Sequence, residues 1–146
     1  MKRIASELAI VVEEAGTVLN SLTSQQWEES SAEGKWTRKE ILGHLIDSAA
    51  NNHHRFIRAQ YESVPSISYN QELWTALQFY KEESVENLVR LWVSYNKHLA
   101  YIISRMPVEN YDRLCDINKN EPITLKNVIT DYLIHLRHHL NQIIIK

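Results

Sequence analysis

The chain has 146 residues, of which 44% are hydrophobic and 23% are charged, and its formal net charge is −2. This size and balance predict one globular domain, spanning residues 1–146, with a buried core. The charge excludes the basic surface of a nucleic-acid-binding protein. No run reaches the roughly 18 apolar residues of a membrane span, and the single cysteine excludes an internal disulfide. We therefore expect a soluble cytoplasmic protein.

Four segments carry the spacing of amphipathic helices. The first, 3–22, has apolar residues three and four apart, and its acidic residues distinguish it from a signal peptide. The second, 37–60, has the best-marked start, because Thr37 and Glu40 form the pattern of a capping box. The third, 84–105, begins at Ser84. The fourth begins near Thr124 and is predicted to run to the end of the sequence.

The connection between the second and third helices is long, at roughly twenty residues, and contains Pro65 and the stretch YNQELWTALQFY. A loop of this length is uncommon unless it is partly structured or functional. Trp74, Leu77 and Phe79 indicate a short helix packed on the rest of the protein. With only three glycines and three prolines in the chain, the four long helices predict an all-α fold, a four-helix bundle.

Histidines are concentrated in the last helix, within DYLIHLRHHLNQ at residues 131–142. His135 and His139 lie one turn apart on one face, a spacing that suits two imidazoles binding one ion, whereas His138 points towards solvent. We favour His44, in the second helix, as the third ligand, although a helical wheel places it somewhat outside the apolar stripe. From spacing alone, ordinary surface histidines on a helical protein remain an alternative.

Other chemistries have less support in the sequence. The Glu-x-x-His pairs of a di-iron bundle, the His-Glu-x-x-His pattern of zinc proteases and a glycine-rich phosphate loop are all absent. Cys115, the single thiol, has no marked partner, so we expect it in a loop or a small satellite core.

Several stretches together resemble the DinB superfamily, the DinB/YfiT-like candidate metalloenzymes: KWTRKEILGHLIDSAANNHHRFIRAQ, YNQELWTALQFY, NKHLAYIISRMP and LKNVITDYLIHLRHHLNQI. The resemblance implies an up-down-down-up four-helix bundle and a homodimer. It also implies a divalent ion, nickel or zinc, held by three histidines that match His44, His135 and His139 here. Relatives in the superfamily include thiol-dependent transferases and isomerases that use bacillithiol or mycothiol, and many members have no assigned reaction.

An ion held by three neutral imidazoles would lower the pKa of a water or a thiol in its open position. The first hypothesis is therefore a metal-dependent enzyme, a thiol transferase or a hydrolase, acting on a small molecule. The alternative is a non-catalytic metal-binding or structural helical bundle. Candidate bases or orienting groups are Asp47, Asn52 and Asp131, with Asn51 and Asn96 as further polar neighbours, and for each of them solvation or bonding between helices is an alternative.

Overall fold

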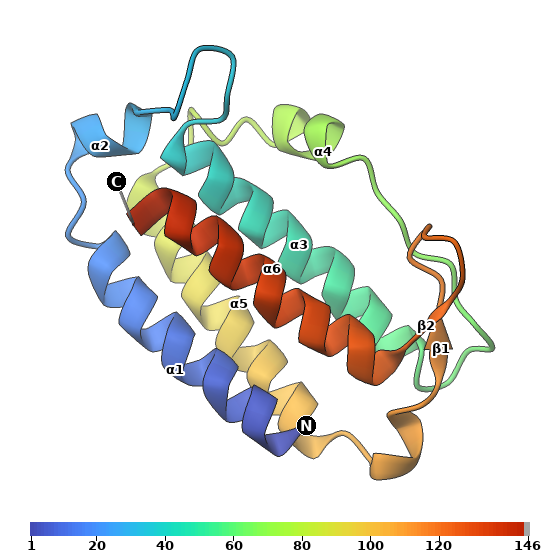
Figure 1. Cartoon of the computed structure of the whole chain (residues 1–146). Coiled ribbons are helices and arrows are strands. Elements are labelled where there is room, and N and C mark those ends of the chain that lie inside the picture. Colours follow the sequence, from blue (N-terminus) through green and yellow to red (C-terminus); the bar gives the residue numbers. More distant parts are fainter. Residues whose placement is uncertain (145–146) are drawn as a thin grey trace.

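The computed structural model describes residues 1–144, and helices dominate it (Figure 1). Its elements in chain order are α1 (Lys2–Leu19), α2 (Ser24–Glu28), α3 (Arg38–Arg58), α4 (Gln71–Leu77), α5 (Val85–Arg105), η1 (Val108–Asn110), β1 (Leu114–Cys115), β2 (Ile123–Thr124) and α6 (Leu125–Ile144). The four predicted long helices are α1, α3, α5 and α6. Whether the last helix continues through 145–146 lies outside the described residues. None of the described helices combines the length and apolarity needed to cross a bilayer.

The long helices form an up-down-down-up bundle, as the family resemblance implied. Figure 1 shows α1 and α6 running in one direction and α3 and α5 in the other. The main packing pairs are α1 with α5 and α3 with both α6 and α5. Because α3 and α5 are parallel neighbours, the chain must return along a helix of 21 residues, about 31 Å, before α5 begins. Residues 59–84, which include α4, make this crossover, and this is why the connection is long.

The predicted helix starts are confirmed in atomic detail. The Thr37 hydroxyl accepts the backbone N–H of Glu40 at 3.2 Å, and the Glu40 carboxylate accepts the N–H of Thr37 at 2.9 Å. Ser84 caps α5. The first helix ends at Leu19, earlier than predicted, and the backbone N–H groups of Ser21 and Leu22 then donate three residues back, to Val18 and Leu19, instead of four.

The predicted short helix of the crossover is present as α4, but Leu77 and Phe79, which were expected to pack it on the bundle, face solvent instead. Leu77 and Phe79 are 69% and 62% exposed. The crossover is instead fixed by Tyr80, whose ring packs on Gly43 of α3 so closely that a Cβ at Gly43 would lie 2.1 Å from a ring carbon. Glycine is therefore required here by the close approach of the ring.

The other end of the crossover is tied to the segment that precedes α6. The Ile67 N–H donates to the Asp116 carbonyl at 2.8 Å, and the Asp116 N–H donates to the Pro65 carbonyl at 3.0 Å. Beside these bonds, β1 pairs with β2 in antiparallel register, Leu114 opposite Thr124. Cys115 is fully buried in β1 at this junction and belongs to the main hydrophobic core, not to a loop or a small satellite core as expected. The crossover thus passes beside the start of α6.

Candidate metal centre

Three histidines from two facing helices converge in the bundle. One ring nitrogen from each of His44, His135 and His139 lies within 4.8 Å of the others. The Nε2 atoms of His44 and His135 are 3.1 Å apart. His44 is completely buried, whereas the helical wheel placed it outside the apolar stripe. The reason is that α6, α5 and the crossover together cover most of the circumference of α3, including its polar flank.

The remaining histidines do not join this group. His138 is exposed, as expected, and its Nε2 accepts a hydrogen bond from Gln142 at 3.2 Å. His54 is also exposed. His53 faces α5, where its Nδ1 lies 3.1 Å from the Tyr95 hydroxyl and its ring contacts His98.

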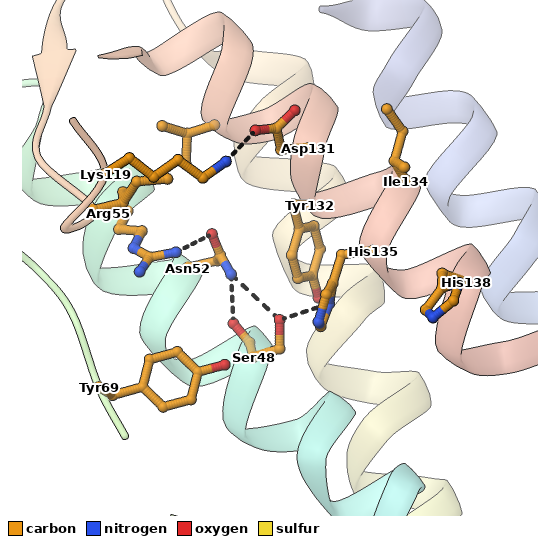
Figure 2. Close-up of a pocket in the computed structure, with 12 residues that line it drawn as sticks. Ser48, Asn52, Arg55, Tyr69, Lys119, Asp131, Tyr132, Ile134, His135 and His138 are labelled. Atoms are coloured by element: carbon orange, nitrogen blue, oxygen red, sulfur yellow. Dashed lines mark hydrogen bonds and ion pairs between the residues drawn. The ribbon is translucent and has the colours of Figure 1, made fainter. Parts of the chain in front are cut away.

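Neighbouring side chains orient the three rings. The Nδ1 of His139 lies 2.7 Å from Oε1 of Gln142, and because an amide oxygen only accepts, this Nδ1 carries the proton and leaves the Nε2 lone pair free. The Nδ1 of His135 lies 3.5 Å from the Ser48 hydroxyl (Figure 2). The ring of Trp36 covers His44 at a centroid distance of 5.0 Å. Such outer contacts are typical of histidines that ligate metals.

The electrostatics of the cluster keep it neutral. Burial, followed by the proximity of the other two rings, lowers the pKa of His44 to about 3. Burial and the neighbouring His139 lower the pKa of His135 to about 4. Burial also lowers the pKa of His139, against the hydrogen bond with Gln142. At neutral pH all three imidazoles therefore keep the lone pairs that a metal ion requires.

The donor set fits a divalent transition-metal ion. Two nitrogens bound to one tetrahedral ion at zinc distances lie about 3.4 Å apart, close to the separation of the His44 and His135 nitrogens. Imidazole suits zinc and nickel alike. The Nδ1 of His44 is buried and has no hydrogen-bond partner among the described residues, so the polar contact of this ring there is the one between its Nε2 and His135.

Two cavities adjoin the cluster, one at His135 and the other at His139. The first, about 580 Å³, reaches His135 and is lined by Ser48, Asn52 and Arg55 of α3, Tyr69 of the crossover and residues of α6 (Figure 2). The second, about 430 Å³, reaches His139 and is lined by Trp36, Arg38 and Glu72 among others. The cluster thus borders, through His135 and His139, two spaces large enough for small molecules.

The other residues nominated from the sequence have different surroundings. Asp47 is buried and accepts hydrogen bonds from the Tyr80 hydroxyl at 2.6 Å and from Gln78 at 2.9 Å, while burial raises its pKa. Asn52 lines the first cavity and donates to the Ser48 carbonyl at 2.9 Å. Asp131 is exposed at the rim of that cavity, 3.4 Å from the Lys119 ammonium. Only Asn52 and Asp131 therefore face the cavity.

Two further asparagines, Asn51 and Asn96, form hydrogen bonds within or between helices. Asn51 donates to the Asp47 carbonyl at 3.0 Å. Asn96 is fully buried, donates to the Trp92 carbonyl at 2.9 Å and accepts the hydroxyl of Tyr132.

The helical wheels place further polar residues on the flanks of the cluster histidines without giving them a role. Ser48 lies with His44, and Gln142 lies with His135 and His139, because residues three and four apart share a helical face. Arg55 lies on the same flank of α3. The position of Tyr69 in the cavity wall could not be predicted from a helical wheel, because only the path of the crossover brings this residue to the cavity.

The comparisons with known proteins agree with this fold. The sequence profile of the DinB superfamily matches residues 8–143. The chain is 25% identical over 129 residues to a protein of Oceanobacillus iheyensis named as a candidate metal-dependent hydrolase, OB0413, covering 88% of this chain and 74% of that one. It is 25% identical over 124 residues to YfiT of Bacillus subtilis, which bears the same description, covering 84% of this chain and 70% of YfiT.

A solved structure resembles this one closely in fold. The structure of YfiT from Bacillus subtilis, described as a probable metal-dependent hydrolase with an unusual four-helix bundle topology, superposes with a TM-score of 0.82 at 24% identity. The superposition covers 95% of this chain and 83% of that one. At this identity the likeness supports the architecture of the bundle.

Proposed function

This chain belongs to the DinB superfamily, and from that premise we propose that it is a divalent-metal-dependent enzyme acting on a small molecule, with His44, His135 and His139 as the metal ligands. One observation carries the proposal: three ring nitrogens converge within 4.8 Å in a setting that holds the pKa values of all three rings low. Unrelated surface histidines are not expected to bring their ring nitrogens together around one fully buried ring, as His135 and His139 do at His44. The metal-dependent names of the relatives give further support.

The chemistry would be divided between the ion and the surrounding side chains. When bound, the ion would supply a positive charge that lowers the pKa of a water or a thiol and polarises an electrophile. Gln142 holds the Nδ1 proton of His139, and Ser48 stands at Nδ1 of His135, so both rings are kept with Nε2 inward. Among the nominated polar groups, we propose Asn52 as the group that orients the substrate, because its side chain lines the cavity beside His135.

Two reaction types fit this site. Hydrolysis agrees with the description of the relatives. Transfer of a low-molecular-weight thiol, such as bacillithiol or mycothiol, would use both cavities, with one reactant beside His135 and the other beside His139. A non-catalytic bundle has less support, because a structural ion needs no cavity at its side. A homodimer, a cytoplasmic location and the choice between nickel and zinc remain predictions from the resemblance and the composition.

Elemental analysis of untagged protein tests the metal site directly. We expect about one equivalent of nickel or zinc per chain after incubation with the metal and gel filtration. His135→Ala and His139→Ala should retain less than about a tenth of that amount. His138→Ala is the matched control, because it removes an exposed histidine from the same helix, and it should retain the metal in full. Absence of stoichiometric metal in the wild type, or equal loss in all three variants, would rule out the assignment.

A kinetic comparison separates the two reaction types. The metal-loaded protein is offered a chromogenic ester, and separately an electrophilic chloronitroarene, which loses chloride when a thiolate substitutes at the ring, with and without a millimolar thiol. A hydrolase releases product from the ester without thiol, whereas a thiol transferase consumes the nitroarene only when thiol is present. Either activity should disappear in His135→Ala and persist in His138→Ala.

A further inference from the structure

Arg55 is a half-buried cation in the wall of the first cavity, and no carboxylate compensates its charge. Its Nε and Nη2 groups donate to the Ile67 carbonyl at 3.1 and 2.8 Å, and Nη1 donates to the Asn52 side chain at 3.4 Å. All of these acceptors are neutral. Among the described residues no carboxylate lies within ion-pair distance of the guanidinium, and burial lowers the pKa of Arg55.

The rest of the cavity does not supply the missing anion. Asp131 is the acidic residue of the lining, but it is exposed at the rim and already pairs with Lys119. The cavity therefore carries an excess of positive charge even before any metal ion is considered. A partly buried charge without a counter-ion is costly, so its retention in a cavity wall favours a ligand that brings the opposite charge.

The guanidinium also retains hydrogen-bonding capacity. It carries five N–H groups, and the three bonds described above leave two for a ligand. A planar fork of this kind matches the oxygens of a carboxylate or a phosphate. Figure 2 shows Arg55, Asn52 and Ser48 following one another along α3 towards His135. A molecule anchored at Arg55 would therefore extend along this wall towards the histidine cluster.

We propose that the first cavity binds the acidic group of the substrate, a carboxylate or a phosphate, through Arg55, with the reacting part of the same molecule beside His135. This inference rests on the proposed function, since it assigns the substrate class to the site of the three histidines. A purely structural Arg55, which only clamps the crossover at Ile67, would have no preference for anions.

The test uses three monosubstituted benzenes: benzoate, its neutral isostere benzamide, and phenyl phosphate. Binding to the zinc-loaded protein is followed by NMR titration, and the series is repeated after chelation of the metal. At least one acid should bind about tenfold or more tightly than benzamide, with a shift of the Arg55 Nε–H resonance. Which acid binds decides between a carboxylate and a phosphate.

Two arginine variants identify the residue responsible. Arg55→Gln should remove most of the preference, weakening the acid about tenfold or more. Arg58→Gln is the matched control, since it removes a cation from the same helix that pairs with Glu62 and does not line the cavity, and it should change the affinity less than about twofold. If Arg55→Gln does not fold, Arg55→Lys, which keeps the charge without the fork, should bind the acid more weakly than the wild type.

The inference is overturned if no acid is preferred over benzamide, if the preference survives Arg55→Gln, or if the Arg55 resonance does not respond in the wild type. The chelated series separates this result from the metal proposal. A protein that binds no metal but shows Arg55-dependent binding of an acid contradicts the proposed function alone. A protein that binds one metal ion but has no Arg55-dependent preference contradicts this inference alone.

Discussion

Acidification of the metal-free protein from pH 7 to pH 5 should lower its free energy of unfolding, because the histidine cluster resists protonation. The pKa of His44 is about 3 in the folded chain, against about 6.5 for an unperturbed histidine. Below pH 6.5 the unfolded chain therefore binds a proton that the folded chain does not. A group of this kind stabilises the fold above its unfolded pKa, and the stabilisation is lost as the pH falls towards the folded value.

The size of the effect follows from the pKa values. Between pH 7 and pH 5, His44 alone accounts for a loss of about 2 kcal/mol. His135, with a folded pKa of about 4, adds up to about the same amount, reduced because the ring is partly exposed. Asp47 acts in the opposite sense, since burial raises its pKa and the folded chain then binds the proton more readily. The net loss should be about 3 kcal/mol.

Urea unfolding in a chelating buffer, followed by the fluorescence of the four tryptophans, measures this loss at the two pH values. His44→Gln should reduce the pH dependence by about 2 kcal/mol, whatever its effect on stability at pH 7. His138→Gln, an exposed change on α6, should leave the dependence as it is in the wild type. A wild-type loss below about 1 kcal/mol, or a full dependence in His44→Gln, would refute the account of a buried neutral cluster.

Three further results are expected. Chelation should lower the thermal midpoint of the metal-loaded wild type, since an ion at a hundred times its dissociation constant stabilises by about 2.7 kcal/mol, and it should leave His135→Ala unchanged in a calorimetric scan. Tyr80→Phe should lower the free energy of unfolding by about 1.5–3 kcal/mol in urea titrations, because it removes the hydroxyl that donates to Asp47. If the predicted homodimer uses the α1–α5 face, where Ile10 and Tyr101 are 56% and 59% exposed, Ile10→Asp should convert the dimer to a monomer in light scattering.

The sequence predicted the features that depend on local rules. Helix starts were found because a capping box is a short pattern with one purpose, and the pair His135 and His139 was found because residues four apart share a helical face. The short helix α2 was missed, although Thr23 and Gln26 form a capping box there too, because five residues offer no apolar period to support the pattern.

Features that depend on packing between distant segments could not be predicted from the sequence. The burial of His44 was not predictable from the wheel, because a wheel gives the direction of a side chain but not how many neighbours cover it. In the same way, Phe79 was expected in a short helix packed on the bundle, whereas Tyr80 makes the close contact with α3, because the sequence could not show that Gly43 leaves room for a ring. The cavity wall formed by Tyr69 also depends on the path of the crossover.

The crossover has a consequence for how such a protein can change. The parallel course of α3 and α5 forces residues 59–84 along the outside of the bundle, and this segment brings Tyr69 and the Ile67 carbonyl to the cavity. It contributes little to the apolar core, whereas the histidines belong to the rigid helices α3 and α6. The crossover therefore contributes one part of the cavity wall, whereas Arg55, Asn52 and the ligand His44 all belong to α3. Exchange of this surface segment between such chains would reshape the cavity beside Arg55 while the three histidines stay in place.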